Sequence, residues 1–168
     1  MQIADIDWDQ WQPQVTATLL FVVKNGQVLL IHKKRGLGAG KINGPGGHIE
    51  AGETPRECAI RETREELLIT PLNVRPAGEL FFHAEDMPRI HGHVFIADDY
   101  LGTPAETDEA IPLWVPVDAI PYDQMWDDDR LWLPLMLAGH TFKGWFTFVD
   151  EHMLDHRIEQ GARIAKTA

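Results

Sequence analysis

Residues 47–69 read GHIEAGETPRECAIRETREELLI and join a glycine-containing loop to the start of a helix. Thr54 is a favourable N-cap and Pro55 suits the first helical position. The side chain of Glu57 can reach back to the amide of the cap residue, which completes a capping box. The stretch therefore predicts a helix that begins at Pro55, directly after the loop.

The predicted helix has two adjacent sectors of different character. At about 100° per residue, one sector packs on a core and the neighbouring sector presents carboxylates. The core sector holds Ala59, Ile60, Thr63 and Leu67. The acidic sector holds Glu62, Glu65 and Glu66.

Glu62 and Glu66 lie one helical turn apart, where two acids repel unless a cation sits between them. Hard oxygen ligands of this kind suit Mg²⁺, with Mn²⁺ as the alternative. Arg61 can pair with Glu65 at i,i+4, which leaves Glu62 and Glu66 freer to bind metal. From the carboxylates alone, a solvated acidic face explains the pattern at least as well.

The register of the carboxylates with an upstream glycine decides between these interpretations. One glycine, one arginine and four acids share it: Gly47, Glu53, Arg61, Glu62, Glu65 and Glu66. This spacing resembles the Nudix box of hydrolases that act on nucleoside diphosphates linked to another group. Leu68 stands where that family usually has glycine. Because glycine normally supplies a left-handed helix end, we expect this helix to end differently.

The length of 168 residues suits one domain with a substantial core, and no break in composition divides the chain. We expect an N-terminal arm over residues 1–14 that packs by its tryptophans, the main domain over residues 15–158 and a C-terminal tail over residues 159–168. The formal net charge of −11 argues against binding to a nucleic-acid polymer or an anionic membrane.

Cys58 is the single cysteine, and we interpret it as a small buried residue rather than a nucleophile. An unpaired cysteine indicates a reducing compartment. No leader pattern or membrane-length apolar run is found, so a cytoplasmic protein is expected. The sequence leaves the oligomeric state open, with a monomer slightly favoured.

Two apolar runs over residues 15–23 and 27–32 flank an Asn25-Gly26 pair, which predicts a β-hairpin. Further strands are expected over residues 72–84, 90–97, 111–115 and 141–149, and a second helix over residues 127–138. The acidic run at residues 127–129 favours a helix N-terminus through capping and the helix dipole. The polar end after His156 is expected to fray.

Three histidines, His83, His91 and His93, flank a loop between two predicted strands. No spacing argument brings them to the acids, so we interpret them as structural or surface residues. Residues 33–40 are basic and then glycine-rich. They suit either a phosphate-contacting strand end with a mobile loop or an ordinary solvated turn.

The resemblance extends over residues 15–158, beyond the box. The chain resembles the Nudix subgroup that hydrolyses oxidised purine nucleoside triphosphates such as 8-oxo-dGTP, through these matches: Lys33-Lys34-Arg35-Gly36, Asn43-Gly44, Gly102-Thr103-Pro104, Asp108-Glu109, Met125-Trp126, Asp128-Asp129 and Trp132. The resemblance implies an α/β (α+β) fold, an α/β/α sandwich around a mixed sheet. It also implies release of the nucleoside monophosphate and pyrophosphate, which sanitises the nucleotide pool.

Carried onto matching positions, the resemblance implies a metal site and catalytic residues. The metal ligands are the Gly46 carbonyl and the carboxylates of Glu62, Glu66 and Glu109, with Glu65 in the same cluster. Arg61 orients the acids. Either Glu65 or Glu66 is the general base, and the sequence does not choose between them.

The resemblance also implies a set of substrate contacts. They are Thr18; Lys33 on the phosphates; Asn43, Asp128 and Asp129 on the base edge; Trp126 on the base face; and Phe82 and Trp132 at the pocket wall. Two adjacent carboxylates in a pocket of low dielectric cannot both ionise cheaply, so one should donate a proton while the other accepts. The departures from the subgroup are Leu37, Ile42, Ala84 and Ile90 at the wall and Asp127 beside the pair.

Two alternatives remain open. The same chemistry can act on ADP-ribose, a dinucleoside polyphosphate or an ordinary dNTP. A Nudix module can also sense a nucleotide without turning it over. Such modules usually lose box carboxylates, whereas this chain retains Glu53, Glu62, Glu65 and Glu66.

Overall fold

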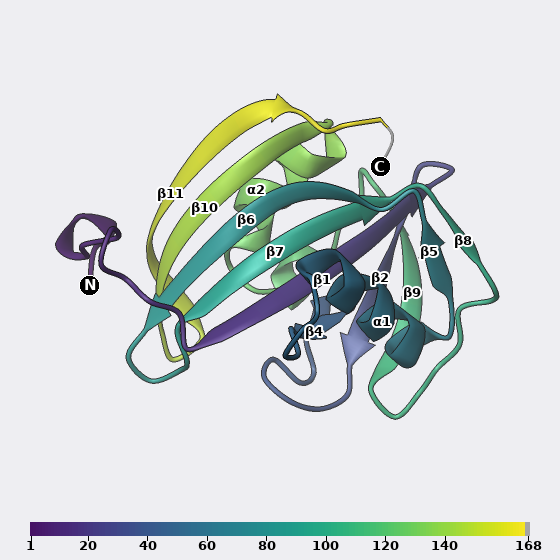
Figure 1. Cartoon of the computed structure of the whole chain (residues 1–168), viewed down its shortest axis with the longest axis horizontal. Coiled ribbons are helices and arrows are strands. Elements are labelled where there is room, and N and C mark those ends of the chain that lie inside the picture. Colours follow the sequence, from purple (N-terminus) through teal and green to yellow (C-terminus); the bar gives the residue numbers. More distant parts are fainter. Residues whose placement is uncertain (167–168) are drawn as a thin grey trace.

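The computed structural model describes residues 1–166, and two α-helices flank a large mixed sheet there (Figure 1). The helices are α1 (Pro55–Leu67) and α2 (Asp129–Leu137). The strands are β1 (Val15–Lys24), β2 (Gln27–Lys33), β3 (Ile42–Asn43), β4 (Gly46–His48), β5 (Thr70–Leu72), β6 (Arg75–Ala84), β7 (Ile90–Ala97), β8 (Asp99–Leu101), β9 (Ala110–Pro116), β10 (His140–Val149) and β11 (His152–Arg163). Short 3-10 helices cover Ile3–Asp5 and Tyr122–Gln124.

The main sheet has the order β11-β10-β6-β7-β1-β2-β3, with β4 also paired to β1 and β9 to β2. Strands β5 and β8 form a separate two-stranded sheet. Side chains of β1 alternate between two cores: Leu20 packs with Ala59 and Leu67 of α1, whereas Phe21 packs with Trp132 of α2. The expected α/β/α sandwich is therefore confirmed. Within residues 1–166, no helix combines the length and the apolar character needed to cross a membrane.

The predicted hairpin forms, but its two strands soon separate. Asn25 and Gly26 have φ values of 53° and 73°, as a tight hairpin turn requires. Only the two residue pairs next to the turn join β1 to β2. Beyond them β1 pairs with β7 and β4, while β2 pairs with β9 and β3. This separation opens the space in which the candidate site lies.

Strand β11 contradicts the expectation that the chain frays after His156. It pairs with β10 from Val149↔His152 to His140↔Arg163 and so crosses the expected boundary at residue 158. Most β11 side chains are exposed on both faces. Because an edge strand is held by backbone hydrogen bonds, its polar sequence carries little sign of the pairing.

The N-terminal arm packs on β6, and its tryptophans make the contacts, as expected. The Trp11 ring lies 5.3 Å from Trp8 and 6.1 Å from Phe81, between ring centroids. The indole Nε1 of Trp11 donates a 3.2 Å hydrogen bond to Nδ1 of His83. Helix α1 covers only part of one sheet face (Figure 1). The N-terminal arm covers one end of the part of that face that α1 leaves uncovered.

Leu68 ends α1 in a way that its sequence did not predict. Its φ and ψ are 61° and 30°, the left-handed conformation that a glycine would adopt, and its amide bonds to the carbonyl of Arg64 at 3.0 Å. The expectation of a different helix end is therefore wrong. The chain keeps the left-handed helix end that a glycine would supply and accepts the steric cost of a side chain there.

Candidate active site

Helix α1 begins as predicted. The hydroxyl of Thr54 accepts a 3.1 Å hydrogen bond from the amide of Glu57, and the Glu57 carboxylate accepts one of 3.2 Å from the amide of Thr54. This capping box orients the first turn. It aims the next two turns, which carry the acidic residues, toward the loop before the helix.

Arg61 connects the box carboxylates, with Glu53 as its main partner. Its Nε and Nη2 bond to the two oxygens of Glu53 at 2.6 and 2.9 Å, and this guanidinium lowers the pKa of Glu53 to about 2. Nη1 also donates to Glu62 at 2.8 Å and to Glu65 at 3.3 Å. The i,i+4 pair with Glu65 is thus present, but Arg61 does not leave Glu62 free.

Two glycines allow backbone and side chain to approach closely at β4. A Cβ on Gly47 would lie 2.4 Å from Cδ of Glu62, and a Cβ on Gly46 would lie 1.8 Å from the carbonyl oxygen of Thr18. Neither site can hold a larger residue without a shift of its neighbours. These glycines therefore bring α1, β4 and β1 together at one point.

Glu66 is the most buried of the box acids, with 6% of its surface exposed. Burial raises the pKa of Glu66 to about 8, although Oε2 accepts a 3.0 Å hydrogen bond from the amide of Gly46. Burial likewise raises the pKa of Glu62. A divalent cation would favour the ionised forms of both acids, so this donor set suits Mg²⁺.

Glu109 approaches this cluster from the loop before β9. Arg35 bonds to Glu109 through Nε at 3.0 Å and through Nη2, and it lowers the pKa of that carboxyl. Lys33 acts electrostatically on both Glu66 and Glu109. In residues 1–166 the box acids do not gather three ligand oxygens within 4.8 Å of one another. The carboxylates stand near each other with Arg35 and Arg61 as counter-charges.

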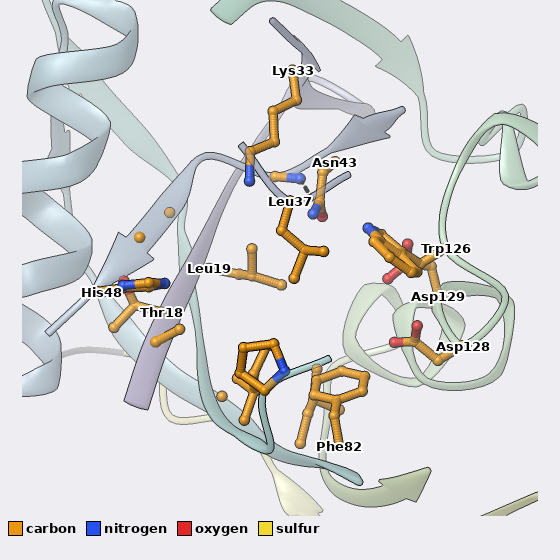
Figure 2. Close-up of a pocket in the computed structure, with 18 of the residues that line it drawn as sticks. Thr18, Leu19, Lys33, Leu37, Asn43, His48, Phe82, Trp126, Asp128 and Asp129 are labelled. Atoms are coloured by element: carbon orange, nitrogen blue, oxygen red, sulfur yellow. Dashed lines mark hydrogen bonds between the residues drawn. The ribbon is translucent and has the colours of Figure 1, made fainter. Parts of the chain in front are cut away.

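A pocket of about 210 Å³ opens beside Glu66 and extends to the start of α2 (Figure 2). Nine of the residues expected in the site line it: Thr18, Lys33, Asn43, Gly46, Glu66, Phe82, Trp126, Asp128 and Asp129. Arg61, Glu62, Glu65 and Glu109 lie outside this lining set. One acid of α1, Glu66, therefore lines the same pocket as the residues expected to contact the purine base.

Asp128 and Asp129 line the pocket on the same side as Trp126 (Figure 2) and are 2% and 3% exposed. Burial raises the pKa of both carboxyls, and for Asp129 the adjacent Asp128 adds to the rise. Oδ2 of Asp129 is buried and has no hydrogen-bond partner within residues 1–166. The run begins α2 as expected, with Asp128 at the N-cap position and Asp129 in the first turn, but neither side chain makes a capping hydrogen bond within residues 1–166.

Trp126 forms one wall and is held by the loop that follows β2. Nζ of Lys41 lies 5.1 Å from the ring centroid, and a Cβ on Gly38 would lie 2.8 Å from the indole nitrogen. Asn43 lies between Lys33 and Trp126 in Figure 2, and its Oδ1 accepts a 2.8 Å hydrogen bond from the amide of Gly44. That bond leaves the Asn43 amide nitrogen available as a donor.

Other wall positions depart from the sequence-based expectation. Trp132 is fully buried behind Asp128 rather than at the pocket surface, and Ile42 belongs to the core. Leu37, Ala84 and Ile90 line the pocket, as expected. His48 and Met87 also line the pocket, and no pattern in the sequence pointed to them, whereas alternation along β10 could have identified Phe148.

Comparison with known proteins places this arrangement in a family. A family model described as the NUDIX domain matches residues 12–136. The chain belongs to the Nudix family. The predicted Nudix box on α1 is therefore confirmed as the family signature of a hydrolase of this class.

Two curated Nudix relatives cover most of the chain. An oxidized purine nucleoside triphosphate hydrolase of Danio rerio is 46% identical over 144 residues, which are 82% of this chain and 92% of the relative. A protein of the same name from Mus musculus is 40% identical over 135 residues, 80% of this chain and 86% of the relative. These names agree with the subgroup that the sequence resembles.

A solved structure supports the Nudix fold independently. The Mutator MutT protein of Bacillus halodurans aligns with a TM-score of 0.78 at 27% identity. The alignment covers 86% of this chain and 97% of that protein. The mixed sheet and its two flanking helices are thus those of a Nudix hydrolase.

Proposed function

We propose that this Nudix hydrolase converts oxidised purine (deoxy)nucleoside triphosphates such as 8-oxo-dGTP to the monophosphate and pyrophosphate. The observation that carries the proposal is the buried pair Asp128 and Asp129 in the same pocket as Glu66. The names of the two curated relatives support the same substrate class. The product chemistry follows from cleavage between the α- and β-phosphates of such a substrate.

The carboxyl pair supplies a donor and an acceptor for a purine edge. Burial and the adjacent Asp128 raise the pKa of Asp129, so Asp129 would be the member of the pair that keeps a proton and donates. Asp128 accepts a hydrogen bond from Trp132 and stays the better candidate for the ionised partner. Trp126 would stack on the base face, and the side-chain amide of Asn43 would add a further donor.

The phosphate end of the substrate would lie toward α1. Glu62, Glu66, Glu109 and the Gly46 carbonyl would hold Mg²⁺, with Mn²⁺ as the alternative. When bound, such an ion polarises the polyphosphate and lowers the pKa of a coordinated water. Lys33 would pair with phosphate oxygens, and Thr18 and Phe82 would complete the wall.

Arg61 would keep the acids in place through its contacts with Glu53, Glu62 and Glu65. The proton of the attacking water would pass to Glu65 or Glu66. Glu65 is more exposed, while Glu66 is buried against the amide of Gly46. A cytoplasmic monomer acting on free nucleotides is the setting that we propose for this reaction.

Steady-state kinetics with 8-oxo-dGTP, 2-hydroxy-dATP, dGTP, a dinucleoside polyphosphate and ADP-ribose test the proposal. We expect the largest kcat/KM for an oxidised purine triphosphate, with pyrophosphate as product. Asp129→Ala should reduce that value more for the oxidised base than for dGTP, because a buried donor to the base is lost. A largest kcat/KM for ADP-ribose, or tight binding without pyrophosphate release, would overturn the assignment.

A further inference from the structure

Three potential metal ligands meet on the sheet outside the substrate pocket. Strands β6 and β7 pair with Glu79 opposite His93 and Phe81 opposite His91. Because side chains two residues apart share a sheet face, His91, His93 and Glu79 project from the same face. None of these three residues lines the substrate pocket. The acid beside these histidines is Glu79, which is not one of the box acids.

The three ligand side chains lie close together. Nε2 of His91 lies 3.1 Å from Oε1 of Glu79, and the two imidazole centroids are 4.3 Å apart. One ligand atom from each residue lies within 4.8 Å of the other two. No other set of three histidine, cysteine or acidic side chains in the described part of the chain meets this condition.

Neighbouring side chains orient the cluster. The Phe81 ring stacks on His91 with centroids 4.6 Å apart and an interplanar angle of 11°. Nζ of Lys143 lies 3.7 Å from Oε2 of Glu79, so it occupies the oxygen that does not face His91. The carboxylate is thus held by a cation on one oxygen and presents the other to the imidazoles.

The surroundings leave room for an exogenous ligand. A groove of about 450 Å³ runs beside Glu79 and His93 and is also lined by Lys143, Thr141 and Glu159. In Figure 1, α1 covers only part of this sheet face, and α2 lies on the other side of the sheet. All three ligands are half-buried, which holds their rotamers while keeping the site open to solvent.

We propose that Glu79, His91 and His93 form a second metal site that binds Zn²⁺. Two imidazoles and one carboxylate are a donor set that Zn²⁺ accepts with a fourth position for water, whereas Mg²⁺ prefers oxygen ligands only. The alternative is a plain Glu79–His91 ion pair with His93 as an unrelated neighbour. The proposed site links β6 and β7, whose opposite face carries Phe82 and Ile90 in the substrate pocket.

Co²⁺ titration in excess Mg²⁺ tests the site, because Mg²⁺ occupies the hard-oxygen ligands and Co²⁺ reports tetrahedral imidazole ligation by visible absorption. We expect one equivalent of Co²⁺ with tetrahedral bands, displaced by Zn²⁺. His93→Ala and the isosteric Glu79→Gln should each weaken binding at least tenfold, within the range for a lost ligand or its partner. His156→Ala, an exposed histidine on β11, should bind normally.

Thermal unfolding gives a second measurement that does not depend on enzymatic activity. Zn²⁺ should raise the Tm of the wild type and of His156→Ala by more than that of Glu79→Gln, since a ligand stabilises the folded state in proportion to how tightly it binds there. Circular dichroism of the metal-free variants checks that each one folds. Equal Co²⁺ affinity in wild type, His93→Ala and Glu79→Gln would overturn the proposal.

Discussion

The indole Nε1 of Trp132 donates a 2.8 Å hydrogen bond to Oδ2 of Asp128, and both residues are buried. Trp132 lies one turn after Asp128 on α2, with its ring 5.2 Å from Phe142 and 5.8 Å from Phe21, between centroids. The core therefore sets the position of a carboxylate that faces the pocket. Packing far from the pocket surface can thus affect how a base is read.

Trp132→Phe removes this donor and leaves a buried acceptor without its partner. We expect the free energy of unfolding to fall by about 1–3 kcal/mol. The pKa of Asp128 should also rise, because the Trp132 hydrogen bond lowers it. Urea unfolding measures the loss of stability. The rise in the pKa of Asp128 should move the acidic limb of the pH profile of kcat/KM for 8-oxo-dGTP to higher pH.

Trp145→Phe is the matched control for that substitution. Trp145 lies on β10 and contacts Phe81 and Arg157 outside the pocket. It should leave the acidic limb of the pH profile where it is. An unchanged profile in Trp132→Phe would show that the indole does not act through Asp128.

Glu66→Gln tests the catalytic role of the most buried box acid. We expect turnover to fall at least a hundredfold, about the lower range for a lost acid or base group, with the fold intact. Glu65→Gln measured alongside it indicates which glutamate takes the proton. A rate near that of the wild type in Glu66→Gln would contradict the assignment of α1 as the catalytic helix.

The raised pKa of Glu66 predicts a pH dependence of stability. The folded pKa is about 8 and the ordinary value is 4.5, so between them the folded state binds more protons than the unfolded state. The contribution of Glu66 is therefore favourable at low pH and is lost as pH rises through this window. The loss is at most about 1.4 kcal/mol per pH unit.

Urea unfolding in EDTA across this window checks the prediction. Glu66→Gln should show a shallower loss of stability than the wild type, whereas Glu65→Gln, with a side chain that is 58% exposed, should follow the wild type. Mg²⁺ should restore wild-type stability at the alkaline end, because it favours the ionised carboxylates. Parallel curves for wild type and Glu66→Gln would contradict the argument.

Leu68→Gly should stabilise the chain. A left-handed leucine costs about 1–2 kcal/mol, which glycine would remove. Glycine also raises the conformational entropy of the unfolded chain, which offsets part of this effect, so we expect the free energy of unfolding to increase by about 0.5–1 kcal/mol. Leu68 is 59% exposed, so little burial is lost. Leu101→Gly, at a similarly exposed strand position, should destabilise the protein. Equal effects at both positions would rule out a backbone origin.

Local signals in the sequence identified the elements whose cause is local. The Asn25-Gly26 turn and the Thr54 capping box predicted the first hairpin and the start of α1, because each depends on hydrogen bonds and torsions of a few adjacent residues. The register of the box acids also identified the Nudix family. The edge strand β11 was not predicted, because backbone hydrogen bonds hold it to β10 and its polar side chains show no strand pattern.

Long-range relationships were accessible only in the tertiary structure. The run at residues 127–129 has the composition of a helix cap, yet Asp128 bonds to Trp132, and Oδ2 of Asp129 has no hydrogen-bond partner among residues 1–166. Glu79 and His93 are fourteen positions apart in the chain and come together through the register of β6 and β7. Composition cannot specify such contacts, since burial and strand pairing decide which polar groups meet.

The amino-acid sequence by itself determined the reaction class of this protein, because the catalytic acids lie on one helix whose periodicity is local. The tertiary structure decided the substrate pocket and the histidine cluster. Each assembles side chains from several strands whose separation or pairing follows from packing of the whole sheet. Glu66 belongs to both levels, since its helical position is readable in the sequence and its raised pKa comes from burial.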